Sequence, residues 1–125
     1  MTIIKFPQKP INEPHFFQEI REEGYHVYSL DNAQKPNFYP SEFPNYPGVP
    51  INELKENDIV TIRVFFGIGK GPKMRVDGGL IDLRVEFVEE DKITAAIITQ
   101  LPKGFPLSNG DSMEVFADEI LYRND

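Results

Sequence analysis

Alternation of apolar and polar residues is clearest in Leu80–Val88 (LIDLRVEFV). A period of two residues is typical of a strand with one face in the core and the other in solvent. We expect the charged residues of this run to form a solvent-facing ladder, which also discourages edge-to-edge pairing with other chains. The core-facing residues would be Ile81, Leu83, Val85 and Phe87, and the ladder would be Asp82, Arg84 and Glu86.

Similar runs elsewhere predict a sheet, because they alternate or are rich in β-branched and aromatic residues. Ile93–Thr99 is apolar on both faces, which favours a central strand or one covered by a helix. Asp118–Tyr122 is either a last helical turn or an edge strand. The other predicted strands are Thr2–Phe6, Tyr25–Leu30, Ile59–Phe66 and Ser112–Ala117.

Two of these strands follow turns of the same pattern, Leu54–Asp58 (LKEND) and Leu107–Asp111 (LSNGD). Each turn has a leucine at its start and an asparagine or glycine directly before an aspartate. Asparagine and glycine tolerate the left-handed backbone conformation of tight turns, so we expect one turn geometry in both places. A third turn, Glu89–Lys92 (EEDK), is acidic and is expected to join two strands as an exposed hairpin turn.

The N-terminal part has the pattern of one amphipathic helix. Asn12 can cap its start, and Gly24 can end it in the left-handed conformation. Between them, Phe16, Phe17 and Ile20 form an apolar stripe opposite charged and polar residues.

These elements predict a single α+β domain over residues 1–125. The N-terminal helix would pack on a bent, mainly antiparallel sheet of five to six strands, which could close partly into a small open barrel. We divide the chain into a strand–helix–strand segment (1–33), an arm rich in proline and aromatic residues (34–50) and a β-sheet core (51–125).

The arm contains five prolines and four aromatic residues. Each proline fixes φ and removes a hydrogen-bond donor, which excludes regular helix and central strand. The aromatics favour an extended segment packed over the body. Two alternatives stay open: a contact with a partner through exposed aromatics such as Tyr39 and Tyr46, and a lid over a ligand pocket. Such a pocket would be lined by Phe38, Tyr39, Phe43 and Tyr46.

Composition excludes several classes of protein. The chain has no cysteine, so disulfides, thiolate zinc sites and a cysteine nucleophile are ruled out, and a cytoplasmic location is the simplest fit. The N-terminus lacks the apolar region of a secretory signal. No run of about 18 apolar residues is present, so we expect no membrane association.

The net charge of −7 is unevenly distributed along the chain. Residues 1–76 contain 9 acidic and 9 basic residues, whereas residues 77–125 contain 11 acidic and 4 basic residues. A phosphate backbone would be repelled by the second part, so we expect no direct nucleic-acid binding. The acidic surface either serves solubility or attracts a basic protein partner.

Signatures of phosphate binding are weak. The glycine-rich loop Gly67–Arg75 fits neither the dinucleotide nor the P-loop spacing, and a strand follows where a helix N-terminus is needed. The simplest interpretation of this segment is a hairpin loop. The alternative is contact with an anion or an acidic partner through Lys70, Lys73 and Arg75.

Catalytic and metal-binding signatures are equally weak. His15 and His26 lack the spacing of a zinc site, and no serine lies in a nucleophile elbow. A hydrolase would require a histidine or a pair of carboxylates buried in a cleft. We therefore favour a protein without enzymatic activity and expect no metal and no cofactor.

The C-terminal half has a familiar order: strand, acidic turn, apolar strand, proline-containing loop and the phrase LSNGDSMEVFADEIL. It resembles small, uncharacterised bacterial β-rich domains, some of which are immunity proteins beside polymorphic toxins. The resemblance covers about half of the chain and implies a protein-binding role, with no catalytic residue to carry over. It rests on Leu107, Gly110, Asp111, Met113, Val115 or Phe116, and Ile120.

The sequence thus favours a non-enzymatic protein-binding module, of an immunity or regulatory type, that uses its acidic C-terminal face. The alternatives are a small-molecule binding domain with the arm as lid, a hydrolase, and an acidic mimic of nucleic acid. The candidate partner-binding residues are Asp82, Glu86, Glu89, Glu90, Asp91, Tyr39 and Tyr46.

Overall fold

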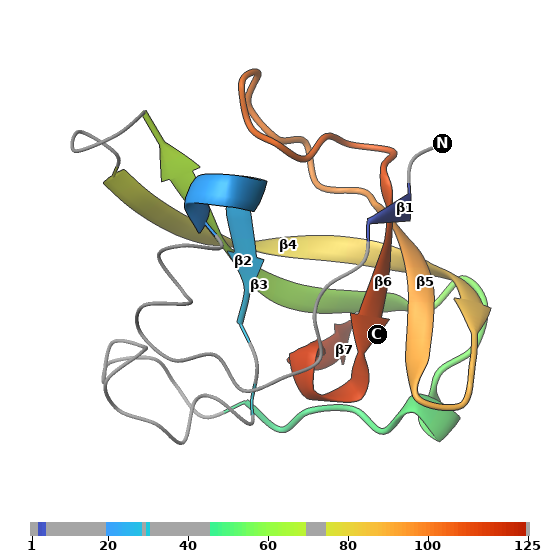
Figure 1. The fold of residues 1–125 in the computed structure, drawn as a ribbon. Helices are drawn as coiled ribbons and strands as arrows, with labels where there is room; N and C mark the ends of the chain where they lie inside the picture. The colour runs from blue at the N-terminus through green and yellow to red at the C-terminus, as the bar shows by residue number, and fades with distance from the viewer. Residues whose placement is uncertain (1–2, 5–19, 29, 31–45, 70–74, 125) are drawn as a thin grey trace.

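The computed structural model describes residues 3–4, 20–28, 30, 46–69 and 75–124, whose strands form one seven-stranded sheet (Figure 1). The strand order is β1-β6-β5-β4-β3-β2, and β7 also pairs with β3. The strands are β1 (Ile3–Ile4), β2 (Tyr25–Val27), β3 (Ile59–Ile68), β4 (Arg75–Val88), β5 (Lys92–Ile97), β6 (Ser112–Phe116) and β7 (Tyr122–Asn124).

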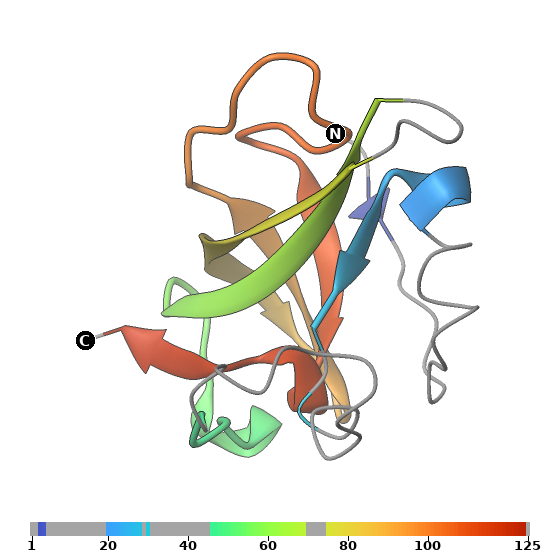
Figure 2. The ribbon, with the colours of Figure 1, turned by 90° about the vertical axis from the view of Figure 1, so that its left-hand side faces the viewer.

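The sheet is antiparallel except for β1, which runs parallel to β6. One edge of β3 pairs with β4 along its whole length, and the other edge is shared by β7 and β2. The strands curl around a common interior (Figure 2), so the expected bent, mainly antiparallel sheet is confirmed. β5 lies between β4 and β6, as its two apolar faces predicted.

Of the expected N-terminal helix, the structure describes residues 20–23 as helical, and positions 12–19 lie outside the described residues. Gly24 has a φ of 89°, and its N–H donates to the Ile20 carbonyl oxygen at 2.9 Å. The helix therefore ends at a left-handed glycine, as expected. Across the part of the chain that the structure describes, no helix has the length and apolar character needed to span a membrane.

The main core lies on the inner face of the sheet. Leu83 in β4 has 0% of its surface exposed, and its neighbours on β3, β5 and β6 are buried with it. Two short 3-10 helices among the described residues, η2 (Ile51–Glu53) and η4 (Ala117–Glu119), contribute residues that pack against this core. The expected last helical turn or edge strand is in fact both, because η4 leads into β7.

A second, smaller cluster covers the outer face of β3. It consists of Ile20, Tyr28, Phe65 and Leu121. Tyr46, in the C-terminal part of the arm, packs against this cluster together with Tyr122. This placement agrees with an arm packed over the body at that point; the rest of the arm up to position 45 lies outside the described residues.

The two turns predicted to be alike have the same geometry. Asn57 and Gly110 have φ values of 77° and 93°, both left-handed. In each turn the aspartate side chain accepts a hydrogen bond of 3.0 Å from the backbone N–H three residues earlier, at Lys55 and at Ser108. The leading leucines are buried. Each turn then pairs with a neighbouring strand, the first with β4 and the second with the end of β5.

β4 begins at Arg75, earlier than the expected start at Leu80. The glycines at 78 and 79 concealed this extension, since glycine is unfavourable in strands. Gly78 lies opposite Phe65, and a Cβ atom built on Gly78 would lie 3.1 Å from the Phe65 ring. The ring therefore occupies the space that a side chain would need, whereas a Cβ on Gly79 meets nothing within 4 Å.

These two neighbouring glycines give opposite expectations. Gly78→Ala should lower the free energy of unfolding by about 1–3 kcal/mol, because the added methyl group crowds the Phe65 ring. Gly79→Ala should raise it by roughly 0.5–1 kcal/mol, because alanine loses less conformational entropy in a strand. Urea unfolding of both variants measures this difference. Equal effects at the two positions would contradict the close packing of Phe65 on Gly78.

Candidate functional site

Among the described candidate partner-binding residues, those of the acidic turn between β4 and β5 are the most exposed. The Glu89 N–H donates to the Lys92 carbonyl oxygen at 2.9 Å and closes the turn, as expected for a hairpin. Glu89, Glu90 and Asp91 are all exposed. Three carboxylates on consecutive residues therefore project from one end of the sheet.

A β-bulge in β4 lies directly before this turn. Val85 pairs with Ala95, but Phe87 pairs with Thr94, so Glu86 is the inserted residue. Bulges of this kind commonly redirect a side chain. The expectation that Phe87 faces the core with Val85 is wrong: the pairing partner of Phe87 lies on the outer face, and 66% of the Phe87 surface is exposed. The bulge therefore places a large aromatic side chain in solvent beside the acidic turn.

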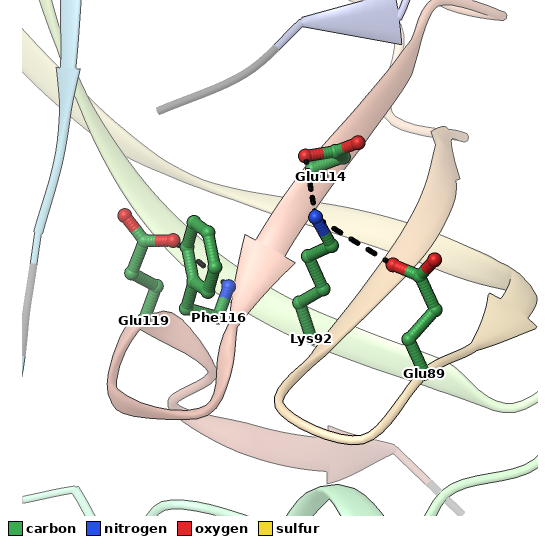
Figure 3. Close-up of polar contacts among 5 residues, drawn as sticks. All are labelled: Glu89, Lys92, Glu114, Phe116 and Glu119. Carbon is green, nitrogen blue, oxygen red and sulfur yellow. Dashed lines mark hydrogen bonds and ion pairs between the residues drawn. The ribbon is translucent and has the colours of Figure 1, made fainter. Parts of the chain in front are cut away.

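Lys92 lies between two carboxylates on the same outer face (Figure 3). Its Nζ is 3.3 Å from Glu114 Oε2 and 3.7 Å from Glu89 Oε2. The hydrogen bond to Glu114 raises the pKa of Lys92 above its usual 10.5, although desolvation opposes the rise. This cation therefore stays charged through the neutral range.

The same cation also contacts an aromatic ring. Lys92 Nζ lies 5.8 Å from the centroid of the Phe116 ring, at the end of β6. The Phe116 N–H donates to Glu119 Oε1 at 2.9 Å, and Glu119 is buried (Figure 3). The strand end beneath Lys92 is thus held by its own hydrogen bond, which gives this side chain a fixed support.

Glu86 is held on the outer face of the sheet. The Ser112 hydroxyl donates to Glu86 Oε1 at 2.6 Å, a distance typical of charge-assisted hydrogen bonds. Ser112 is 1% exposed and belongs to β6, two strands away from β4. Ala96 pairs with Ser112 on the strand between them, and its small side chain allows the contact across β5.

Asp82 makes similar internal contacts. Its Oδ1 accepts a 2.7 Å hydrogen bond from the Thr61 hydroxyl, and its N–H donates to Thr99 Oγ1 at 2.7 Å. Asn124 in β7 donates to the same Thr61 hydroxyl at 2.6 Å. Asp82 is half-buried, so the expected solvent ladder is replaced at this position by a network that joins β3, β4 and β7.

Of the two aromatic candidates in the arm, Tyr46 is among the described residues and Tyr39 is not. Tyr46 is half-buried, with ring centroids 6.2 Å from Tyr28 and 6.1 Å from Tyr122. Burial raises the pKa of Tyr28, the nearby Tyr46 adds to the rise, and Arg63 opposes it. Tyr39 and the other residues of the predicted ligand pocket at 38 and 43 lie outside the described residues.

Most of the other candidate residues lie outside the part of the chain that the structure describes. Arg75 is exposed at the start of β4, and Lys70 and Lys73 lie outside the described residues. His15 is also outside them. His26 is buried and stacks on Phe65, with ring centroids 6.2 Å apart. Within the described ranges, no three histidine or carboxylate side chains are grouped so that they could hold a metal ion.

The sequence did not identify Phe87 and Lys92 as members of the site. The regular alternation of Leu80–Val88 gives no sign of an inserted residue, and this hides the outward position of Phe87. Lys92 carried a weak signal, since it is the single basic residue of the EEDK turn. Its partner Glu114 is distant in sequence, so the pair becomes visible only when β5 and β6 are aligned.

Comparisons with known proteins add no relative. No protein-family model matches the chain, and neither the curated proteins nor the solved structures provide a match. The resemblance to immunity-type bacterial domains stays a prediction from the sequence.

Proposed function

We propose that the chain is a non-enzymatic protein-binding module that contacts its partner through the β4–β5 hairpin. The proposed contact surface, here called the hairpin surface, consists of Phe87, Glu89, Glu90 and Asp91. The observation that carries the proposal is the exposure of Phe87: this residue has 66% of its surface exposed and lies beside three exposed acidic residues. Large aromatic side chains are the usual anchors of protein interfaces.

The chemistry of this surface defines the partner. Burial of the Phe87 ring would supply apolar contact energy, which requires a hydrophobic pocket on the partner. The carboxylates around the ring require basic residues at the rim of that pocket, where opposite charges speed association and exclude acidic proteins. The partner is therefore a basic protein with an apolar pocket among lysines or arginines.

An immunity or regulatory role is the specific form of this proposal. The resemblance of residues 78–121 to immunity-type domains supports it, because such proteins act by binding another protein. An acidic surface with an aromatic anchor is suited to a basic target. The alternative is a small-molecule site beneath the arm. Most of the residues expected to line it lie outside those described, so no observation supports this alternative.

Selection from a displayed library of random 16-residue peptides tests the proposal. The immobilised full-length protein and a Phe87→Ala variant of the same protein are used as baits in parallel selections, without counter-selection. We expect enriched peptides that combine lysine or arginine with bulky apolar residues and that bind the wild type more tightly. Enrichment of acidic peptides, or of peptides that bind both baits equally, would refute the hairpin surface as the binding site.

Charge reversal tests the electrostatic part of the surface. Glu90→Lys combined with Asp91→Lys should lower the association rate constant for a selected basic peptide by about 10-fold at low ionic strength. The loss should shrink at 1 M salt, where the Debye length falls to about 3 Å. Stopped-flow fluorescence at several salt concentrations measures both effects.

A control with the same change in net charge separates this site from the overall charge. Glu23→Lys combined with Asp77→Lys reverses two exposed acidic residues outside the hairpin surface. Asp77 lies opposite Phe66, near the far end of β4 from the acidic turn. We expect this variant to change the rate constant much less than the hairpin variant does. Equal losses would mean that the peptide responds only to total charge.

A further inference from the structure

The bulge at Glu86 distinguishes the observed register of the hairpin from a regular register that has no bulge. In the observed register Phe87 pairs with Thr94 and Val88 pairs with Ile93. If the strand continued the pairing of Val85 with Ala95 without a bulge, Phe87 would lie opposite Ile93. Ile93 is a core residue on the inner face, with 0% of its surface exposed. A shift by one residue therefore moves the ring from the outer face to the inner face.

Burial of the Phe87 ring favours the regular register, in which the smaller Val88 would take the outer position opposite Lys92. In that register the Phe87 ring would face the interior instead of solvent, and the strand would keep its alternation. The bulged register must therefore be stabilised by contacts that the regular one lacks. The contact closest to the inserted residue is the hydrogen bond from the Ser112 hydroxyl to Glu86 Oε1 at 2.6 Å.

We propose that the Glu86–Ser112 hydrogen bond selects the bulged register and thereby keeps Phe87 on the outer face, where it can contact a partner. This inference rests on the proposed function for its biological meaning. Glu86 is then a positioning residue that acts through Phe87. It is not one of the carboxylates that the partner contacts, although the sequence placed it among them.

The surroundings of the hydrogen bond fit this role. Ser112 is buried and is the first residue of β6, directly after the turn that ends at Asp111. That turn is fixed by the Asp111 side chain, which accepts a hydrogen bond from Ser108. The hydroxyl is therefore presented from a rigid position. Glu86, whose partner is fixed, is restrained in turn.

Three variants separate positioning from charge. Glu86→Ala and Ser112→Ala each remove the hydrogen bond, whereas Glu86→Gln keeps an acceptor oxygen and removes the charge. We expect each alanine variant to weaken binding of a fluorescein-labelled peptide from the library selection by about 10-fold. Glu86→Gln should bind within about 2-fold of the wild type. The double alanine variant should be no weaker than either single variant, since both lose the same contact.

The register itself is measured without any partner. NMR cross-strand contacts of Phe87 with Thr94 report the bulged register, and contacts with Ile93 report the regular one. We expect Phe87–Ile93 contacts to appear in both alanine variants and to be absent from Glu86→Gln. Thr99→Val is the control, because it removes a hydroxyl that contacts Asp82 on the same sheet and should leave Phe87 opposite Thr94.

The outcomes distinguish this inference from the proposed function. Unchanged Phe87–Thr94 contacts in both alanine variants would overturn the role of the hydrogen bond, whatever the peptide affinities are. Peptide binding by Glu86→Gln that is as weak as by Glu86→Ala, with the register unchanged, would mean that the Glu86 charge contacts the partner directly. If Phe87→Ala binds the peptide as well as the wild type, the hairpin surface fails, but the NMR measurement still decides what sets the register.

Discussion

Leu83→Ala is expected to lower the free energy of unfolding by about 2–5 kcal/mol. Leu83 is fully buried in the middle of β4, between Val60 on β3 and Ile97 on β5. Truncation to alanine removes apolar contacts to both neighbouring strands and leaves a cavity in the core. Chemical denaturation, followed by circular dichroism, measures the change as a lower midpoint with a similar slope.

The control for this prediction is Leu80→Ala in the same strand. Leu80 faces the outer side and is 43% exposed, so its truncation should cost less than about 1 kcal/mol. The two variants make the same chemical change and differ in the face of the sheet. Similar losses at both positions would mean that the inner and outer faces of β4 are assigned incorrectly.

Local patterns predicted much of this fold from the sequence. The inner positions Ile81, Leu83 and Val85 are each no more than 1% exposed, as the alternation indicated. The paired turns before β3 and β6 were also correct, because the need for a left-handed residue before aspartate is visible in the residue types themselves. Such features depend on a few consecutive residues, so they can be predicted without a structure.

The failures arise from contacts between distant residues. Phe87 continues the alternation perfectly in the sequence, yet an inserted residue in the pairing with β5 turns it outward. Nothing in Leu80–Val88 encodes the partner strand's register. Glu86 looked like a free surface charge because its hydrogen-bond donor, Ser112, is two strands away. Charge and alternation therefore indicated the candidate region. Identifying the side chains that form it required knowledge of the strand pairing.

Asp82 and Glu86 illustrate the difference between an acidic composition and an acidic binding surface. Both were expected on a solvent-facing ladder, and both accept hydrogen bonds from buried hydroxyls. Their carboxylates are engaged in joining strands. The carboxylates available to a partner are mainly those of the turn, Glu89 to Asp91, which are exposed. The surface that we propose for a basic partner is therefore smaller than the sequence implied and is centred on Phe87.

Phe87→Ala is expected to weaken binding of a peptide selected on the wild type by at least about 30-fold, which corresponds to about 2 kcal/mol for a hot-spot aromatic residue. The loss should appear mainly as faster dissociation, because the ring supplies burial and the neighbouring carboxylates supply attraction at a distance. Surface plasmon resonance measures both rate constants.

The free energy of unfolding should respond much less to Phe87→Ala than to Leu83→Ala. Phe87 is mostly exposed, so Phe87→Ala should change the free energy of unfolding by less than about 1 kcal/mol. Leu80→Ala serves again as the control, since it removes another exposed apolar side chain from the outer face of β4 and should leave peptide affinity unchanged. A large loss of stability with no loss of affinity would show that the ring belongs to the core. The combination of weak binding and intact stability would identify an aromatic side chain that the fold presents in order to bind a partner.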